Sequence, residues 1–264
     1  MSRRASAPGS GPDAALGHPR APGGPLGHPH VHRRRTDSTN DRARELALAG
    51  APHGTLVTAA EQTAGRGRQG RRWSAPAGMA LLMSLLLRSQ PTEDGEQLAP
   101  LLPLIAALAV CDVAGDAARI KWPNDVVVQR GDGLAKLAGI LTEGRPQEGW
   151  AIVGIGLNVA VRIDELPSEL HDSAATLGLP SAEIEPTLEL LLEALARRLG
   201  EPAETTLRAW RARDALVGRA VTWSGGAGVA EGIDGAGRLV VALDGGGRVT
   251  LDAGEVHLGR PPGG

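Results

Sequence analysis

The chain has 264 residues, with 28 Lys and Arg against 30 Asp and Glu, which leaves a formal net charge of -2 at neutral pH. This size predicts one large domain or a medium domain with a small one, and the near-neutral charge disfavours a strongly basic nucleic-acid binder. The single cysteine, Cys111, excludes an internal disulfide and a multi-cysteine zinc site, so we expect the reducing cytoplasm.

Neither a membrane anchor nor an exported chain is expected. The apolar runs at residues 79–87 and 98–110 are shorter than the roughly 20 residues that span a bilayer. Residues 1–32 are rich in Pro, Gly, Ala and His and have almost no large apolar side chains, so they predict a disordered tail. Its histidines are separated by Gly and Pro, which gives them no preformed metal geometry.

Helix and strand patterns replace this tail from Thr36 onward. N-cap side chains at residues 37–40 and Gly50 bracket a first helix, and residues 64–78 form a long loop rich in Gly and Arg. Together the patterns predict a central, largely antiparallel sheet with helices against it. The expected strands are 55–60, 79–87, 119–128, 135–142 and 150–161, and the further helices are 98–113, 188–199 and 203–210.

The C-terminal segment has a different pattern, with short alternating strands between Asp-Gly turns. The strands are expected at 219–223, 229–233, 239–243 and 249–251. They predict a small β-barrel of about fifty residues, the size of a minor second domain.

The first chemical motif is GRGRQGRRW at residues 65–73. It places four guanidinium groups on a backbone that three glycines leave free to approach a ligand closely. Arginine matches carboxylate and phosphate oxygens with forked donors, so an anionic ligand is one interpretation. A solvated, flexible segment that touches RNA backbones is the alternative, and this motif alone favours neither.

The second motif is KWPND at residues 121–125, a polar interruption in a stretch that otherwise resembles a strand. Buried Lys, Asn and Asp side chains are costly unless they pair or face a ligand. The alternative to a ligand site is a Lys121–Asp125 pair that fixes a bend at Trp122 and Pro123.

The third and fourth motifs are KLAGILTE at residues 136–143 and GIGLN at residues 154–158. Strand alternation predicts Lys136, Ala138 and Ile140 on one face and Gly139 on the other. A lysine beside a glycine-bearing strand suits a phosphate, although it can also extend to solvent. Glycines in the fourth motif leave room for a flat ligand beside Asn158.

In this order the four motifs resemble the biotin protein ligase family, from about Thr36 to Val161. The resemblance implies an α+β fold with a mostly antiparallel central sheet and helices, as in class II aminoacyl-tRNA synthetases, and a C-terminal SH3-like β-barrel. It implies a catalytic domain at residues 33–213 and an SH3-like domain at 214–264. The implied reaction joins biotin and MgATP into biotinyl-5'-AMP, from which a carrier-protein lysine takes the biotinyl group.

The resemblance also assigns roles to individual residues. The implied catalytic set is Arg68, Lys121, Asp125 and Lys136. The implied biotin-binding set is Ser38, Thr39, Gln62, Gly65, Arg66, Arg68, Trp73, Lys136, Gly139 and Gly156, although Trp73 is equally explained as a packing anchor. The implied ATP and adenylate set is Arg66, Arg68, Arg71, Lys121, Asn124, Lys136 and Asn158. Asn124 and Asp125 are the candidate ligands for Mg2+.

The expected partner is the biotin carboxyl carrier protein of acyl-CoA carboxylases, and the expected assembly is a monomer or weak homodimer. Some members of the family carry an N-terminal winged helix-turn-helix, but the tail has no helix signal for one, so binding to DNA is not expected. Two rivals remain, a lipoate ligase and a biotin-responsive nucleic-acid binder. The motifs GRGRQGRRW and KWPND disfavour the first, and the charge disfavours the second.

Overall fold

The computed structural model describes residues 26–88, 99–145, 148–252 and 256–259. The strands are β1 His30–Arg33, β2 Leu56–Ala59, β3 Ala80–Arg88, β4 Arg119–Lys121, β5 Asp125–Arg130, β6 Gly133–Arg145, β7 Trp150–Asn158, β8 Ala220–Trp223, β9 Gly226–Ile233, β10 Leu239–Ala242, β11 Arg248–Leu251 and β12 His257–Leu258. The α-helices are α1 Thr39–Leu48, α2 Leu102–Ala114, α3 Ile184–Leu199 and α4 Ala203–Arg211.

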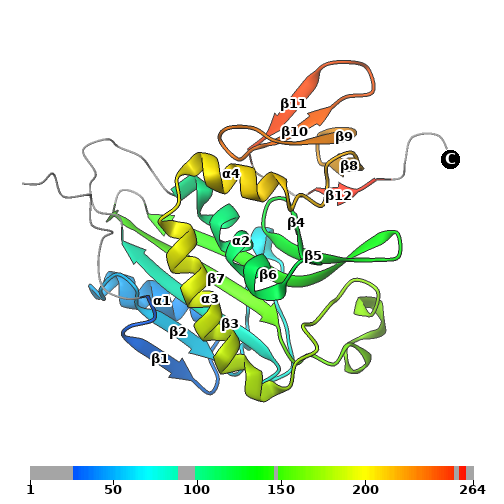
Figure 1. The fold of residues 1–264 in the computed structure, drawn as a ribbon. Helices are drawn as coiled ribbons and strands as arrows, with labels where there is room; N and C mark the ends of the chain where they lie inside the picture. The colour runs from blue at the N-terminus through cyan, green and yellow to red at the C-terminus, as the bar shows by residue number, and fades with distance from the viewer. Residues whose placement is uncertain (1–25, 89–98, 146–147, 253–255, 260–264) are drawn as a thin grey trace, which may run out of the picture.

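The strands form two sheets (Figure 1). The large sheet has seven strands in the order β1-β2-β3-β7-β6-β5-β4, and only its β1–β2 pair is parallel within the described residues. A five-stranded antiparallel sheet, in the order β11-β10-β9-β8-β12, forms the C-terminal unit. The predicted fold class, a mostly antiparallel α+β sheet with a small C-terminal β unit, is confirmed.

The two faces of the large sheet are packed against different elements. Alternate residues of β3, such as Leu81 and Leu85, belong to the main core with apolar residues of α2 and α3. On the opposite face Leu86 packs with Ala43 and Ala47 of α1. Helices α2 and α3 therefore close one face, while α1 and the loop at residues 64–78 share the other.

Most expected elements lie where the periodicity placed them, but residues 119–128 do not form one strand. They form β4 and β5, which turn back on each other so that Lys121 pairs with Asp125. Pro123 has no backbone N–H to donate to a ladder, so the chain turns at this point instead of continuing through a polar interruption. The short strand β12 was not expected at all.

The predicted disordered tail is wrong at its C-terminal end, while its residues 1–25 lie outside the described part. Residues His30–Arg33 form β1, which pairs in parallel with β2. The rings of His30 and His32 both hydrogen-bond Thr58 Oγ1, at 2.7 and 2.9 Å. Backbone pairing, these polar contacts and the packing of Val31 against the cluster that includes Val57 and Leu86 order this segment.

The C-terminal unit contacts the polar turn between β4 and β5. Trp122 is buried, and its Nε1 donates a 3.1 Å hydrogen bond to the carbonyl oxygen of Gly237. The backbone of Ile120 also bonds that of Arg213 and Ala215. The division of the chain at residues 213 and 214 stays a prediction.

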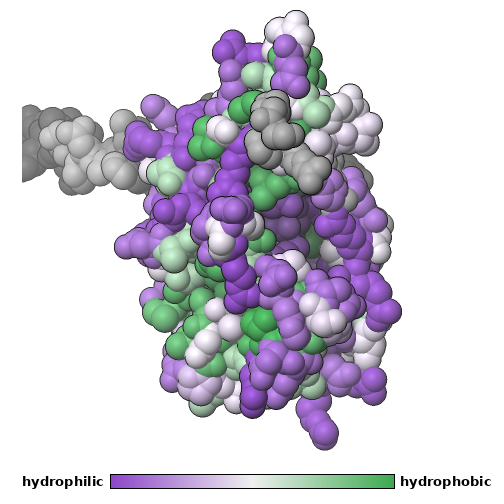
Figure 2. All heavy atoms as spheres, turned by 90° about the vertical axis from the view of Figure 1, so that its right-hand side faces the viewer, coloured by the Kyte–Doolittle hydropathy of each residue, from purple (hydrophilic) through white to green (hydrophobic). Residues whose placement is uncertain are grey.

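Hydrophilic side chains predominate on the face in Figure 2, with hydrophobic side chains between them. Among the described residues, none of the helices combines the length and the apolar character needed to cross a bilayer.

Candidate active site

Glycines form the floor of a slot on the face of the sheet that α1 partly covers. Gly139 of β6 lies directly opposite Gly156 of β7, and Gly154 lies opposite Ser84 of β3. A Cβ atom added at Gly154 would lie 2.1 Å from Asn40 Oδ1, and one at Gly156 would lie 2.5 Å from the indole of Trp73. The missing side chains therefore let two other groups lie directly on the sheet.

Residues 65–73 fold back on themselves over this slot, and their two sides are joined by backbone hydrogen bonds. The amide of Trp73 donates to the carbonyl oxygen of Gly65 at 2.9 Å, and the amide of Gly67 donates to that of Arg71 at 2.8 Å. A Cβ atom on Gly65 would lie 2.5 Å from the carbonyl oxygen of Trp73, so the two sides meet this closely only with glycine there. Contact between Gly65 and biotin stays a prediction.

The indole of Trp73 lies inside the slot. It packs with Ala80, Leu82 and Val161, and the ammonium of Lys136 lies 5.5 Å from the ring centroid. Its Nε1 is buried without a hydrogen-bond partner in the described residues. The cavity measures about 110 Å³, below the roughly 300–1,000 Å³ of most ligand pockets. Trp73 thus anchors the loop and also occupies space that a ligand would need.

Cationic side chains gather at the end of the slot beside the β4–β5 turn. Lys136 Nζ lies 2.7 Å from Asp125 Oδ1. Burial lowers the pKa of Lys121, and the nearby Lys136 and Arg71 act in the same direction while Asp125 opposes them. Burial also lowers the pKa of Arg68, again against the attraction of Asp125. Four cations around one carboxylate leave an excess of positive charge, which suits an anionic ligand.

The face of Lys136 differs from the expected one. Val126 pairs with Ala138 but Val127 pairs with Lys136, so a β-bulge inserts one residue into β6. A Cβ atom on Gly139 would lie 3.2 Å from Lys136 Nζ, which places both residues in the slot. The predicted grouping of Lys136 with Ala138 and Ile140 is wrong, because strict alternation does not hold across a bulge.

The other end of the slot holds neutral polar groups. Thr39 donates to Gln62 Oε1 from its backbone amide at 2.7 Å and from its hydroxyl at 3.1 Å. Ser84 Oγ lies 2.8 Å from Thr39 Oγ1 and 2.6 Å from Asn40 Oδ1. Ser38 and Thr39 are buried beside this network. Hydroxyl and amide groups of this kind offer both donors and acceptors to a ligand.

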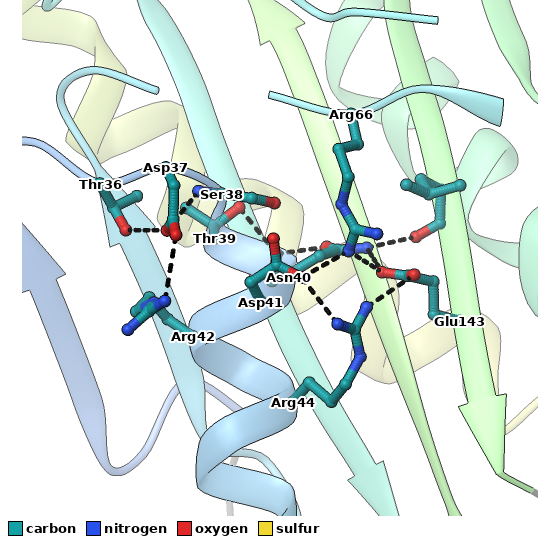
Figure 3. A network of polar contacts seen from close by, with 12 residues as sticks. Thr36, Asp37, Ser38, Thr39, Asn40, Asp41, Arg42, Arg44, Arg66 and Glu143 are labelled. Atoms are coloured by element: carbon teal, nitrogen blue, oxygen red, sulfur yellow. Dashed lines mark hydrogen bonds and ion pairs between the residues drawn. The ribbon is translucent and has the colours of Figure 1, made fainter. Parts of the chain in front are cut away.

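Arg66 points toward two carboxylates, those of Asp41 and Glu143 (Figure 3). Its Nη2 donates to Asp41 Oδ1 at 2.8 Å and to Glu143 Oε2 at 2.9 Å. Arg44 bonds the same two carboxylates at 2.7 and 2.8 Å. Contact of Arg66 with the adenylate stays a prediction. The sequence patterns assigned no role to Asp41, Arg44 or Glu143, although Glu143 ends the third motif.

Most of the predicted site residues line one cavity. These are Ser38, Thr39, Gln62, Arg66, Arg68, Arg71, Trp73, Lys121, Asn124, Asp125, Lys136, Gly139 and Gly156. Gly65 and Asn158 do not line it. Asn158 is buried and donates from Nδ2 to the carbonyl oxygen of Ala175 at 2.8 Å, so its role toward the adenylate stays a prediction. Lining residues that the sequence patterns did not assign include Asn40, Met83, Trp122, Leu141, Ile155 and Val256.

The candidate magnesium ligands are only partly available. Asn124 Nδ2 donates to the carbonyl oxygen of Ile140 at 3.0 Å, and Asp125 is paired with Lys136. In the described part of the chain no group of three or more His, Cys, Asp and Glu side chains is placed to hold a metal. One carboxylate fits a magnesium ion that is bound mainly by the phosphates of its substrate and by water.

Both parts of the chain match known protein families. Residues 33–159 match the Biotin/lipoate A/B protein ligase family, and residues 227–259 match the Biotin protein ligase C terminal domain. The Bifunctional ligase/repressor BirA of Bacillus spizizenii is 43% identical over 153 residues, which cover 55% of this chain and 45% of that protein. This chain thus matches about half the length of the Bacillus relative.

Two other matches extend over most of the chain. The solved structure of the biotin protein ligase from Aquifex aeolicus in complex with biotin and ATP is similar with a TM-score of 0.69 and 27% identity, covering 88% of this chain and 98% of that one. The Biotin--[acetyl-CoA-carboxylase] ligase of Paracoccus denitrificans is 38% identical over 246 residues, 85% of this chain and 98% of that protein. The resemblance of the four motifs is therefore confirmed, and the chain belongs to the biotin protein ligase family.

Proposed function

We propose that the chain is an ATP-dependent ligase that attaches biotin to a lysine of the biotin carboxyl carrier protein of acyl-CoA carboxylases, through biotinyl-5'-AMP. The observation that carries the proposal is the glycine-floored slot, which has neutral polar groups at one end and a cationic cluster at the other. Biotin has the same division, with a ureido ring at one end and a carboxylate at the other.

In the first step a biotin carboxylate oxygen attacks the α-phosphorus of ATP, and pyrophosphate leaves with the electron pair of the broken P–O bond. Both reactants are anions, so the barrier includes their repulsion. Lys121, Lys136, Arg68 and Arg71 surround the place where the two charges meet and reduce that repulsion. Lys136 is the best placed, because it lies beside both Gly139 and Trp73.

In the second step the neutral amine of the carrier lysine attacks the acyl carbon, and AMP leaves as the amide forms. The amine loses a proton in this step. Asp125 is the carboxylate at the cationic end, where its Oδ1 lies 2.7 Å from Lys136 Nζ, and it is our candidate acceptor for that proton. Lys121 and Asp125 are therefore our candidates for assisting at the phosphate and the incoming lysine.

The ring end of the slot is assigned to Ser38, Thr39 and Gln62. The ureido group has two N–H donors and one carbonyl acceptor, and these side chains supply both partners. Trp73 must shift for the ring and valeryl chain to lie over Gly156, and its unpartnered Nε1 then becomes available to the ligand. The loop that carries it would close over the adenylate and exclude water.

Magnesium would arrive with ATP, held by the phosphates and by Asp125, with Asn124 beside it. When bound, the ion supplies charge neutralisation for the leaving pyrophosphate. The chain's own contribution is to position the phosphates with Lys121 and the loop arginines. A monomer or weak homodimer stays our expectation for the assembly.

The test is transfer of label from biotin to a carrier. The protein is incubated with MgATP, labelled biotin and a purified biotin carboxyl carrier domain, and the label is located by mass spectrometry. We expect label on one carrier lysine, dependent on ATP and lost when a chelator removes magnesium. A parallel incubation with lipoate tests the rival activity, and label transfer from lipoate but not from biotin would overturn the proposal.

A further inference from the structure

We infer that Glu143 is a positioning residue that couples the ring end of the slot to the loop through Arg66. Its carboxylate lies at the meeting point of three segments that are far apart in the sequence, namely α1, the loop and β6 (Figure 3). The inference rests on the proposed function, because it concerns how bound biotin affects the loop that would cover the nucleotide.

Glu143 makes three short polar contacts. Its Oε2 accepts from Asn40 Nδ2 at 2.7 Å and from Arg66 Nη2 at 2.9 Å, and its Oε1 accepts from Arg44 Nη2 at 2.8 Å. The Glu143 side chain is about one quarter exposed, at 24%. Because both carboxylate oxygens are used, a change in one contact alters the geometry available to the others.

From Asn40 a chain of hydrogen bonds reaches the ring end of the slot. Asn40 Oδ1 contacts Ser84 Oγ, which contacts Thr39 Oγ1, and Thr39 bonds Gln62. Asn40 itself lies on Gly154, in the floor of the slot. A ligand that engages Thr39 and Gln62 therefore acts on a network that ends at Glu143.

From Arg66 the network reaches the loop. Arg66 follows Gly65, where the two sides of the loop meet, and its backbone forms an antiparallel β-bridge with that of Arg72 on the opposite side. Asp41 is the second carboxylate on Arg66, and Arg44 balances the charge of the pair. The guanidinium of Arg66 thus holds the start of the loop against α1 and β6. Arg68 and Trp73 lie further along the loop and can move when a ligand binds.

Coupling of this kind has a reciprocal thermodynamic signature. If biotin orders the Asn40–Glu143–Arg66 network, biotin strengthens nucleotide binding, and the nucleotide strengthens biotin binding by the same factor. A purely structural Glu143 would change folding stability and leave that factor unchanged. The factor is therefore the quantity that distinguishes positioning from simple stabilisation.

The experiment compares the parent protein with Glu143→Gln and with Glu45→Gln as the matched control. Glu45 lies on α1 and pairs with Arg42, outside the network. Affinity for a non-hydrolysable ATP analogue is measured by calorimetry without biotin and with saturating biotin. We expect biotin to tighten the analogue by at least about fivefold in the parent and the control, and by less than about twofold in Glu143→Gln.

A second measurement needs no ligand and no turnover. Hydrogen exchange of the Gly67 and Trp73 amides, which bond across the loop, should be several-fold faster in Glu143→Gln than in the parent and the control. Glu143→Asp should restore part of the protection, because it keeps the charge. Asp41→Asn gives an independent variant that removes the other carboxylate from Arg66 and should also speed exchange.

Equal loop exchange in the ligand-free parent and Glu143→Gln would overturn the inference, whatever the activity. So would a coupling factor in Glu143→Gln equal to that of the parent. Failure of the proposed function is a different result, in which the parent itself transfers no biotin. A general loss of melting temperature in Glu143→Gln with parent-like coupling also contradicts the inference, since it assigns Glu143 a structural role only.

Discussion

Two ionic clusters in this protein use the same chemistry in different surroundings. The site cluster consists of Asp41, Arg44, Arg66 and Glu143, and its ion pairs span 2.7 to 2.9 Å. The helix cluster consists of Asp112, Arg197, Arg198 and Glu201, and its pairs span the same distances. Pair geometry alone therefore does not separate a functional network from a structural one.

The surroundings separate them. The helix cluster joins Asp112 of α2 to Arg197 and Arg198 of α3, two helices that share the main apolar core. Its ions reinforce a contact that burial already makes. The site cluster joins α1 and β6 to a loop in which Arg66, Arg68 and Trp73 are at most partly buried. The apolar contacts of that loop lie on the side of Trp73, so polar contacts decide where the side that carries Arg66 lies.

The largest expected effect comes from removing one cation from the active site and, for comparison, one from the helix cluster. Lys136→Ala should lower the rate of adenylate formation by about 100-fold or more, because the charge that meets the reacting anions is lost. Arg197→Ala removes a cation from the helix cluster and should leave the rate within about twofold. Pyrophosphate release measures both. A parent-like rate for Lys136→Ala would remove this lysine from the site.

A smaller effect is expected at the loop. Arg68→Ala should release free biotinyl-5'-AMP about tenfold faster when no carrier is present, because the half-buried guanidinium no longer covers the intermediate. Arg198→Ala is the control in the other region and should leave release unchanged. Chromatography of the filtered reaction measures the free adenylate. If no more escapes than from the parent, Arg68 does not retain the intermediate.

In the helix cluster the expected effect is on folding. Asp112 is 17% exposed and accepts from both arginines, so Asp112→Ala should lower the free energy of unfolding by about 1–2 kcal/mol. Thermal melting would show a drop of about 2–8 °C, with biotin transfer at 25 °C unchanged. Loss of transfer without loss of stability would contradict the division between the two clusters.

The same aspartate predicts how this contribution depends on pH. Burial raises the pKa of Asp112, but hydrogen bonds and charge from Arg198 outweigh it, so the pKa lies below its usual 3.8. A lowered carboxyl pKa gives stability that is complete above the unfolded value and is lost as pH falls through the folded value. The difference in stability between parent and Asp112→Asn should therefore be constant at neutral pH and shrink below about pH 4.

Much of this fold could be predicted because its signals are local. Continuous apolar runs define β3 and α2, and an apolar stripe at helical spacing defines α3. Each glycine and basic motif of the slot is also a short run in the sequence. Strand β1 could not be predicted in the same way. Its order comes from backbone pairing with β2, from two histidine contacts to Thr58 and from the packing of Val31, and a single apolar residue leaves no periodic pattern.

The site followed the same rule. Lys136, Gly139 and Gly156 were found from their motifs, but the bulge that turns Lys136 toward Gly139 is a slip of backbone register with no residue pattern of its own. Glu143 lies 77 positions from Arg66 and 103 from Asn40, so no spacing rule connects them. Residues whose role depends on such distant contacts need the folded structure to be recognised.

The smallest expected effect is the different response of the active site and of the helix cluster to alkaline pH. Burial, with Lys136 and Arg71, lowers the pKa of Lys121 below 10.5, whereas hydrogen bonds from Arg198 to Asp112 raise the pKa of that arginine. As pH rises, Lys121 loses its proton before an ordinary lysine does, while the helix cluster keeps its charge. Adenylate formation should therefore decline on the alkaline side while the protein stays folded. Lys121→Arg, which keeps its charge, should move that decline to higher pH, and an unmoved decline would show that another group causes it.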